Sequence, residues 1–184
     1  KSLLALLAEL EKTSKTFWNI SRETAEFLHV LAEGIHTKNI LEIGTSNGYS
    51  GIFLASACRK LYTVESHNER FNLAAENFKK AGLEHRIKQV KGHAPEILWS
   101  LRAKFDLVFF DATKYEYASY LETVLPKIAK GGFVVADNVE SHKNELGAFF
   151  KEVRALKNVK VFYVPIGTGL LVLQKSLLQK SPRL

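Results

Sequence analysis

Hydrophobic positions along the chain fall into two kinds of pattern. Near the start, leucines recur at the three- and four-residue spacing of one helical face, so residues 2–12 are predicted to form an amphipathic helix. A second helix is predicted to begin after Ser21, a residue type that caps helices, and to run to about Ala32, with Gly34 as its stop signal. Beyond it the chain changes to short apolar runs that alternate with helical stretches.

Seven apolar runs have the length and composition of β-strands. They are Asn39–Ile43, Leu61–Val64, Ile87–Val90, Phe105–Phe110, Phe133–Ala136, Val159–Val164 and Leu170–Leu173. Helices are predicted between the first five runs, at about 48–58, 68–81, 94–103 and 116–129, and after the fifth at about 142–156. This alternation is typical of a parallel sheet covered by helices on both faces. Residues 165–169 are too few for a helix, so the last two runs are predicted to form a hairpin that places an antiparallel strand at the sheet edge.

Composition favours one globular domain. The 184 residues are 46% hydrophobic and 24% charged, without a low-complexity tract or repeat. A single cysteine, Cys58, excludes an internal disulfide and suits a reduced, cytoplasmic setting. No apolar run is long enough to cross a bilayer, and the leucine-rich start lacks the cleavage site of a signal peptide. We therefore expect a cytoplasmic protein that does not associate with membranes.

The loop after the first predicted strand has the features of a cofactor site. Ligands of open α/β sheets bind beyond the carboxyl ends of the strands, and Gly44 allows a tight turn and a close approach there. The Gly-x-x-x-Gly spacing from Gly44 to Gly48 disfavours both a dinucleotide fingerprint and a Walker loop. Glu65 ends the second strand, 21 residues after Gly44, where an acid can accept hydrogen bonds from ribose hydroxyls. Glu42 would be a costly buried carboxylate unless it also served the ligand.

Acidic and amide side chains follow the fourth and fifth predicted strands. Asp111 ends one strand, and Asp137 and Asn138 end the next, so all three are expected at the same sheet edge. Two carboxylates and an amide carbonyl suit a hard divalent cation, although Asp and Asn are also ordinary turn residues. Lys114 is the candidate general base, because a nearby dication favours the neutral form of a lysine and eases the loss of a hydroxyl proton.

Together these segments resemble the catechol and caffeoyl-CoA O-methyltransferase family. Leu41–Ser50 is similar to the cofactor motif of the family, and Phe105–Tyr117 and Val134–Val139 are similar to two further motifs, within a resemblance that spans residues 15–174. The resemblance implies a Rossmann-like α/β methyltransferase fold, in which a seven-stranded, mostly parallel sheet has an antiparallel last strand and helices on both faces. It divides a single domain, residues 1–184, into N-terminal helices (1–35) that cover the site and a Rossmann-like core (36–175).

The resemblance also implies ligands and their contacts. The cofactor would be S-adenosylmethionine, and Asp111, Asp137 and Asn138 would bind a divalent metal, usually magnesium. Asn19 and Ile20 align with the segment that covers the cofactor, Ser50 with a contact to its carboxylate, and Gly92–Ala94 with the adenine contacts. The expected cofactor-binding residues are Ile20, Glu42, Gly44, Ser50, Glu65, His93, Ala94 and Asp111.

Several residues near these positions allow two interpretations. Trp18 either forms a wall of the pocket or packs in the core, and His142 follows the metal loop closely enough to contact the substrate. Thr113 stands where relatives often carry an aspartate, which leaves the acceptor open.

The methyl acceptor is expected to be a small phenolic or catechol-like hydroxyl. A hydroxylated uridine of transfer RNA is the alternative, which the net charge of +7 and the pI of about 9.4 would suit, although the basic residues are scattered as on an ordinary solvated surface. An inactive cofactor-binding module is the alternative from another class, and the intact set of Asp111, Lys114, Asp137 and Asn138 disfavours it. Relatives are commonly dimers, so a homodimer is possible.

Overall fold

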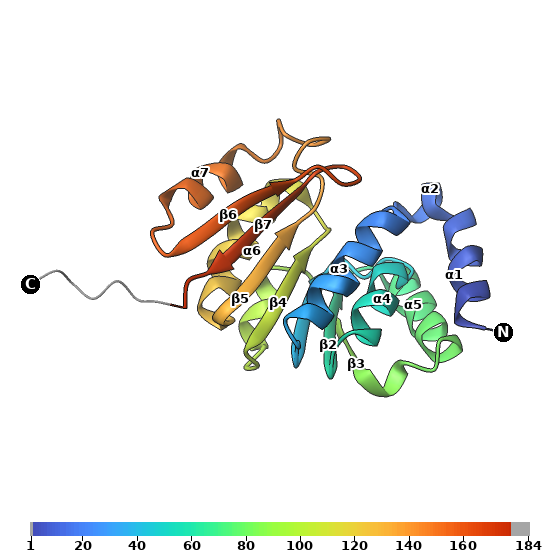
Figure 1. Ribbon diagram of the computed structural model, residues 1–184. Helices are drawn as coiled ribbons and strands as arrows, with labels where there is room; N and C mark the ends of the chain where they lie inside the picture. The colour runs from blue at the N-terminus through green and yellow to red at the C-terminus, as the bar shows by residue number, and fades with distance from the viewer. Residues whose placement is uncertain (1, 178–184) are drawn as a thin grey trace, which may run out of the picture.

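A seven-stranded sheet forms the centre of the computed structural model, which describes residues 2–177 (Figure 1). Its strand order is β3-β2-β1-β4-β5-β7-β6. The strands are β1 (Asn39–Ile43), β2 (Lys60–Glu65), β3 (Ile87–Lys91), β4 (Phe105–Phe110), β5 (Ile128–Ala136), β6 (Val159–Val164) and β7 (Leu170–Lys175). Strands β1 to β5 pair in parallel, and β7 runs antiparallel to both β5 and β6. The predicted fold class is confirmed.

Helices cover both faces of this sheet. They are α1 (Leu3–Lys12), α2 (Ser14–Phe17), α3 (Arg22–Gly34), α4 (Tyr49–Ser56), α5 (Asn68–Lys80), α6 (Tyr117–Val124) and α7 (Gly147–Ala155), with short 3₁₀ turns η1 (Glu84–Arg86), η2 (Glu96–Ser100), η3 (Lys114–Glu116) and η4 (Leu125–Lys127). None of the helices among residues 2–177 has the length and apolar character that a bilayer crossing requires.

Alternate residues of β4 enter two separate hydrophobic cores. Leu107 and Phe109 pack with α1, α3, α4 and α5, whereas Val108 and Phe110 pack with η2, α6 and α7. Successive side chains of a strand point to opposite faces, so a strand buried on both faces favours apolar residues at successive positions. This explains the continuous apolar run that the sequence shows at β4.

Most strand predictions agree closely with the structure, although β5 begins at Ile128 and not at Phe133, and some helix predictions were too long. The stretch at 94–103 forms only the short turn η2, which begins after Pro95 and contains one buried residue, Leu98. The stretch predicted at 116–129 ends as a helix at Val124, and Ile128 already begins β5. Pro126 lies at this change, where it occupies the first turn of η4. The last helix begins at Gly147, later than predicted.

The antiparallel strand is not at the sheet edge, as the hairpin prediction had placed it. β7 lies between β5 and β6, and β6 is the edge strand. Residues 170–173 of β7 are all buried, whereas residues 160–163 of β6 are exposed. The more apolar strand of the hairpin therefore takes the inner position, where both of its faces are covered.

Polar contacts attach the N-terminal helices to the sheet layer. The Ser21 hydroxyl accepts a hydrogen bond from the Thr24 backbone N–H at 3.1 Å, which confirms the predicted cap of α3. Glu11 Oε1 accepts a 2.6 Å hydrogen bond from Tyr49 Oη and lies 2.8 Å from Arg22 Nη2. One carboxylate thus joins α1 to both α3 and α4.

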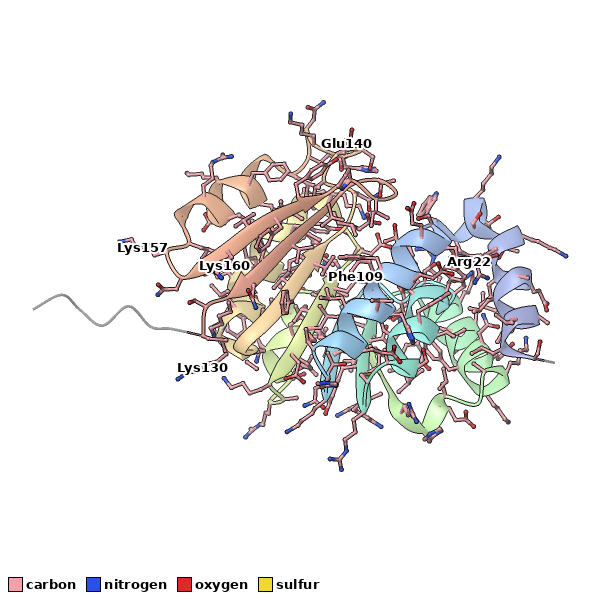
Figure 2. All side chains as sticks on the ribbon, in the orientation of Figure 1. Arg22, Phe109, Lys130, Glu140, Lys157 and Lys160 are labelled. Atoms are coloured by element: carbon pink, nitrogen blue, oxygen red, sulfur yellow. The ribbon has the colours of Figure 1, made fainter. Side chains whose placement is uncertain are left out.

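Truncation of Phe109 should show how much the packing around β4 contributes to stability. Phe109 has no exposed surface and lies inside the sheet (Figure 2). We expect Phe109→Ala to lower the free energy of unfolding by about 3–5 kcal/mol, because it leaves a cavity in a packed core. Phe162→Ala removes the same atoms from the edge strand, where the side chain is 52% exposed, and should cost less than about 1 kcal/mol. Urea unfolding of both variants gives the comparison, and equal losses would contradict this account of the core.

Candidate cofactor and acceptor site

A cavity of about 950 Å³ lies beyond the carboxyl ends of the parallel strands. The loops that follow β1 to β5 line it, together with residues 17–21 and the hairpin loop at residues 167–168. This is the edge at which open α/β sheets bind ligands, and the strand order reverses here, between β1 and β4. The volume is sufficient for a nucleoside-sized ligand together with a second small molecule.

Gly44 is required by the crossing of two backbones at this edge. Its φ is +103°, and a Cβ atom built there would lie 2.1 Å from the Asp111 carbonyl oxygen. A side chain would therefore collide with backbone that cannot yield. The absence of a side chain lets the chain turn directly after β1 and leaves the space above it to the cavity.

Glu65 holds the loops after β1 and β2 in place through hydrogen bonds to their backbone. Its two carboxylate oxygens accept hydrogen bonds from the backbone N–H groups of Ser46 and His67, both at 2.9 Å. Glu65 also lines the cavity, where the lone pairs left on its oxygens can accept from a ligand. The residue predicted to bind ribose hydroxyls thus lies at the cavity wall and is held rigidly.

Glu42 and Ser50 lie below the cavity and do not line it. Glu42 accepts hydrogen bonds from Ser50 Oγ at 2.5 Å and from Thr63 Oγ1 at 2.6 Å. Thr63 is in turn 2.6 Å from Thr45 Oγ1, in the glycine loop. Burial raises the pKa of Glu42 to about 7, in spite of the two hydrogen bonds, which oppose that shift. These two side chains support the loop from below, and a direct contact with a ligand stays a prediction.

The remaining residues of the predicted cofactor set line the cavity. Ile20 approaches from the segment before α3, and His93 and Ala94 approach from the loop after β3. Trp18 also lines the cavity, is 74% exposed, and lies under the Arg70 guanidinium at 5.2 Å from its ring centre, so it does not pack in the core.

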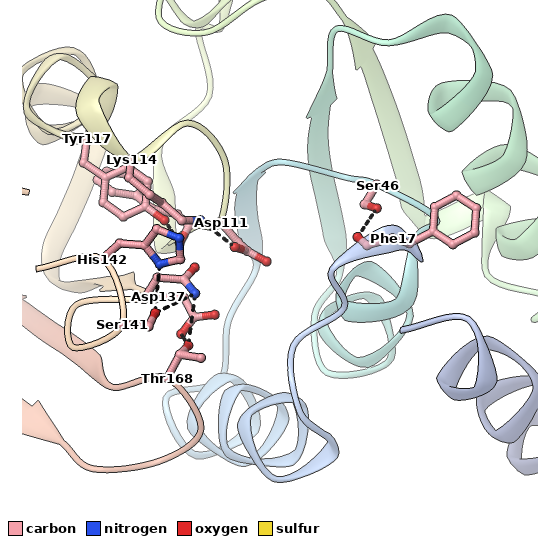
Figure 3. A network of polar contacts seen from close by, with 11 residues as sticks. Phe17, Ser46, Asp111, Lys114, Tyr117, Asp137, Ser141, His142 and Thr168 are labelled. Carbon is pink, nitrogen blue, oxygen red and sulfur yellow. Dashed lines mark hydrogen bonds and ion pairs between the residues drawn. The ribbon is translucent and has the colours of Figure 1, made fainter. Parts of the chain in front are cut away.

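Asp111 and Lys114 form an ion pair at the end of β4 (Figure 3). Lys114 Nζ lies 3.0 Å from Asp111 Oδ1 and 5.4 Å from the centre of the Tyr117 ring. Tyr117 is fixed beneath it by a hydrogen bond of 3.0 Å from its hydroxyl to the Phe110 carbonyl. Both charged side chains are largely buried, so the ammonium group is held at one place in the cavity wall.

Asp137 lies on the same side of the cavity as Asp111 and Lys114 (Figure 3), and Asn138, the next residue, also lines the cavity. Thr168 Oγ1 donates a 2.7 Å hydrogen bond to Asp137 Oδ1. Burial, and after it the negative charge of Asp111, raise the pKa of Asp137 to about 6. Two acids that are close enough to affect each other are therefore brought together, as the strand ends predicted.

Asn138 presents an unused acceptor at this place. Its φ is +64°, and its amide nitrogen donates to Ser141 Oγ at 3.3 Å and to Thr168 Oγ1 at 3.2 Å. Its carbonyl oxygen, Oδ1, is buried and has no hydrogen-bond partner within the described residues. Residues 2–177 contain no cluster of three or more His, Cys, Asp or Glu side chains arranged for a metal. Any cation here would therefore rely on two carboxylates and this amide oxygen.

Two residues of this part of the site could not be assigned from the sequence. Thr168 comes from the hairpin loop and bridges Asp137 and Asn138, but between two glycines it has the appearance of turn chemistry alone. His142 lines the cavity, where a substrate contact stays a prediction, and its Nδ1 lies 2.9 Å from Ser141 Oγ.

Comparisons with protein families and with known sequences all indicate the same family. A profile of the family described as O-methyltransferase matches residues 2–176. A catechol O-methyltransferase of Niastella koreensis is 35% identical over 145 residues, which are 75% of this chain and 66% of that protein. Caffeoyl-CoA O-methyltransferase 2 of Populus trichocarpa is 32% identical over 140 residues, which are 70% of this chain and 57% of that protein. The chain thus spans somewhat less than two thirds of the length of these relatives.

Solved structures share the fold. The O-methyltransferase TomG from Streptomyces achromogenes, in complex with SAM, superposes with a TM-score of 0.86 at 28% identity, over 93% of this chain and 89% of that one. An O-methyltransferase from Bacillus cereus in complex with SAH superposes with a TM-score of 0.85 at 24% identity, over 94% and 91% of the two chains. The second likeness supports the fold alone.

The buried Glu42 should make stability depend on pH. Its pKa is about 7 in the folded protein and 4.5 in the unfolded chain, so the folded state retains the proton as the pH rises between these values. The free energy of unfolding should therefore fall from about pH 4.5 to pH 7, by about 3 kcal/mol at most. Glu42→Gln removes this contribution and should gain stability relative to the natural protein between pH 5 and pH 8.

Urea unfolding at both pH values tests this expectation. Glu76→Gln makes the same change on the exposed face of α5. The free energy of unfolding of this control should differ from that of the natural protein by the same amount at both pH values. A constant difference for Glu42→Gln as well would show that Glu42 does not titrate in this range.

Proposed function

The chain belongs to the O-methyltransferase family, and we propose that it transfers a methyl group from S-adenosylmethionine to the hydroxyl of a small phenolic acceptor, assisted by a divalent cation. One observation carries the proposal. A single cavity has an acid suited to a ribose, Glu65, beyond a glycine turn, and a cluster of oxygen ligands, Asp111, Asp137 and Asn138, at its other end. A donor and an acceptor can therefore meet between the two ends.

The cofactor end is formed by the loops after β1, β2 and β3. Glu65 would accept hydrogen bonds from the ribose hydroxyls, while Gly44 leaves room for the chain that carries the sulfur. Ile20, His93 and Ala94 would enclose the nucleoside. S-adenosylmethionine supplies a methyl group that is already activated on a sulfonium, so the protein needs mainly to position the reactants and exclude water.

The residues at the other end fit a hard divalent cation such as magnesium. Asp111 and Asp137 provide carboxylate oxygens, and the unpartnered Oδ1 of Asn138 provides a neutral one. A cation bound there would neutralise the two acids and make an acceptor hydroxyl easier to deprotonate. Thr168 and Ser141 orient Asp137 and Asn138 through their hydrogen bonds.

Lys114 is placed to manage the proton of the acceptor. Asp111 and the Tyr117 ring hold its ammonium group at the cavity wall, within the part of the site where the acceptor hydroxyl would lie. We assign Lys114 as the general base that receives this proton. Exposed aromatic rings of Trp18 and Tyr115 at the same cavity support a flat phenolic acceptor, since such rings pack well against one another.

The N-terminal helices would act as the cover of this site within a single domain. Ser46 Oγ donates a 2.8 Å hydrogen bond to the carbonyl of Phe17, which joins the glycine loop to the last residue of α2 (Figure 3). Residues 17–21 line the cavity from that side. This supports residues 1–35 as a cover over the core of 36–175, although Lys1 and residues 178–184 of the proposed domain lie outside the described part of the chain.

Transfer from labelled cofactor tests the proposed reaction. The acceptors should include vicinal phenols, monophenols and bulk transfer RNA, each with magnesium and with a chelator. Magnesium-dependent labelling of vicinal phenols is the expected result. Labelling of RNA alone would move the acceptor to the alternative class, and cofactor binding without transfer to any acceptor would favour an inactive binding module.

Removal of the Asp137 charge should separate chemistry from cofactor binding. Asp137→Asn keeps the size of the side chain and an acceptor for Thr168, but it weakens the proposed cation site. We expect magnesium-stimulated transfer to fall by on the order of a hundredfold or more, with little change in the affinity for S-adenosylhomocysteine.

Asp106→Asn is the matched control for Asp137→Asn. Asp106 lies at the opposite end of the sheet, where Oδ2 accepts hydrogen bonds from the backbone of Lys38 and Asn39. Asp106→Asn should reduce thermal stability and leave turnover unchanged. Full magnesium-stimulated activity in Asp137→Asn would reject the metal assignment.

Glu65→Gln should weaken cofactor binding. The change removes the charge and leaves one backbone N–H of Ser46 or His67 without an acceptor. We expect the affinity for S-adenosylhomocysteine to fall by roughly 2 kcal/mol, the value of a charge-assisted hydrogen bond. Calorimetry gives the measurement, with Glu69→Gln, an exposed acid in the first turn of α5, as the control. Equal affinities for all three proteins would remove the ribose assignment.

A further inference from the structure

Basic residues that are scattered along the sequence gather at one edge of the sheet. This edge consists of the amino ends of β1 to β6 and the carboxyl end of the antiparallel β7, and it lies opposite the cavity. Every strand carries a lysine there, either directly before its first residue, within its first three residues or, in β7, as its last residue. With one further lysine and three arginines, they form the basic edge: Lys38, Arg59, Lys60, Arg86, Lys88, Arg102, Lys104, Lys127, Lys130, Lys160 and Lys175.

The charges of the basic edge are not cancelled by ion pairs. Within residues 2–177, every ion pair of a lysine or arginine with a carboxylate involves Arg22 or Lys114, neither of which belongs to this edge. Some of the ammonium groups are held by backbone carbonyls instead: Lys104 Nζ donates to Pro126 at 2.7 Å, and Lys127 Nζ donates to Leu101 at 2.6 Å. A carbonyl fixes an ammonium group without removing its charge, so the positive potential remains available to an anionic partner.

The acids of the same segments are few and partly occupied. Asp106 Oδ2 accepts hydrogen bonds from the backbone N–H groups of Lys38 and Asn39. Lys130 lies at the lower end of the sheet and Glu140 at the upper end, where the acids of the cavity also lie (Figure 2). The acids in or next to the segments of the basic edge are Glu33, Glu84, Asp106 and Glu122. The molecule is therefore electrically polarised along its strands.

An exposed aromatic ring lies beside the basic edge. Trp99 is 67% exposed, and Arg102 follows it by three residues, so the chain keeps their Cα atoms within about 11 Å of each other. Between them lies Leu101, whose carbonyl holds the Lys127 ammonium group. A row of cations beside an aromatic ring that can stack on a base is the combination by which proteins bind single-stranded nucleic acids.

The twist of the sheet decides which polyanion fits this row. Neighbouring strands lie about 4.8 Å apart, so an edge of seven strands is about 29 Å long. Each strand is rotated from the next by about 20–25°, which accumulates to roughly 120–150° over the sheet. A planar membrane surface or a straight duplex meets only part of such a winding row, whereas a flexible single strand can follow it.

We propose that the basic edge binds a single-stranded segment of RNA, with phosphates at the lysines and a base stacked on Trp99. RNA is the nucleic acid that regularly displays unpaired loops. Phosphate contacts carry no sequence information, so this binding is independent of base sequence.

This surface is separate from the proposed methyl-transfer site. Strands β1 to β4 have five or six residues, which places about 16–20 Å of sheet between the basic edge and the cavity. RNA bound at the edge is therefore not the methyl acceptor, and the inference does not depend on the proposed function.

Fluorescence anisotropy of a labelled oligouridine of about 20 nucleotides tests the proposal on the full chain. The edge variant carries three changes at exposed lysines: Lys38→Gln, Lys130→Gln and Lys160→Gln. The matched control removes three exposed lysines elsewhere and has the same net charge: Lys12→Gln, Lys15→Gln and Lys143→Gln.

We expect the control variant to bind like the natural protein, within about twofold. The edge variant should bind about tenfold to a hundredfold more weakly at 0.1 M salt, because each phosphate contact adds about 0.7 to the dependence of log affinity on log salt concentration. The steepness of this dependence should accordingly fall by about 2 in the edge variant. Equal losses in the two variants would show attraction by net charge alone and would overturn the basic edge.

The two tryptophans distinguish the edge from the cavity. Trp99→Leu should weaken binding by about tenfold, the value of one stacked base. Trp18→Leu alters the cavity and should leave binding unchanged. In that variant Trp99 is the one remaining tryptophan, and oligouridine should quench its fluorescence.

Competition and alternative ligands complete the test. Saturating S-adenosylhomocysteine should leave oligouridine bound, and displacement, or weaker binding in Trp18→Leu, would place the RNA in the cavity and overturn the proposal. Tighter binding to an RNA duplex of the same length, or to phosphatidylserine vesicles, than to oligouridine would overturn the choice of a single strand. Absence of oligouridine binding at low salt would overturn it as well.

Discussion

The close approach of the carboxyl ends of β1 and β4 is the constraint on which the site depends. These strands are neighbours in the sheet, and the Asp111 N–H donates to the Ile43 carbonyl at 3.0 Å. Gly44 therefore passes against the backbone of Asp111 at a distance that no side chain permits. Because the chain turns there without filling the space, the loops after β2 and β3 lie on one side of the cavity and those after β4 and β5 on the other. The same contact places the proposed donor and acceptor ends within one volume.

Polar groups near this contact are arranged at two depths. Below the loop, Glu42 is fully buried and is satisfied by the hydroxyls of Ser50 and Thr63, as the cost of an isolated buried carboxyl demands. At the cavity wall, Glu65 holds two loop amides, and the Asn138 carbonyl oxygen has no protein partner. The deeper groups thus make the loop rigid, whereas the upper groups retain acceptor capacity for ligands. An enzyme that must position two reactants needs polar groups that contact the ligands and a rigid structure that holds those groups in place. The two layers described here have these properties.

The proposed acceptor end differs from the proposed cofactor end in the part of the chain that holds its side chains in place. Glu65 is held by backbone groups of its own neighbourhood, whereas Asp137 and Asn138 are held by Thr168, which comes from the distant β6–β7 hairpin. That hairpin reaches the site because β7 inserts between β5 and β6. The geometry of the proposed cation ligands therefore depends on the last part of the described chain, and on the apolar run that buries β7.

The sequence by itself determined the strands, the glycine turn and the acids at the strand ends. These features arise from local chemistry, since hydrophobic period, glycine and strand-terminal polar residues act over a few neighbours, as in β4, Gly44 and Asp111. Only the tertiary structure decided that Glu42 and Ser50 lie beneath the cavity and that Thr168 joins Asp137. Those pairs are separated by up to 31 residues, as Asp137 and Thr168 are, and no local pattern links them. They meet because the strand order, set by competition for burial between apolar runs such as β6 and β7, brings their loops to the same edge.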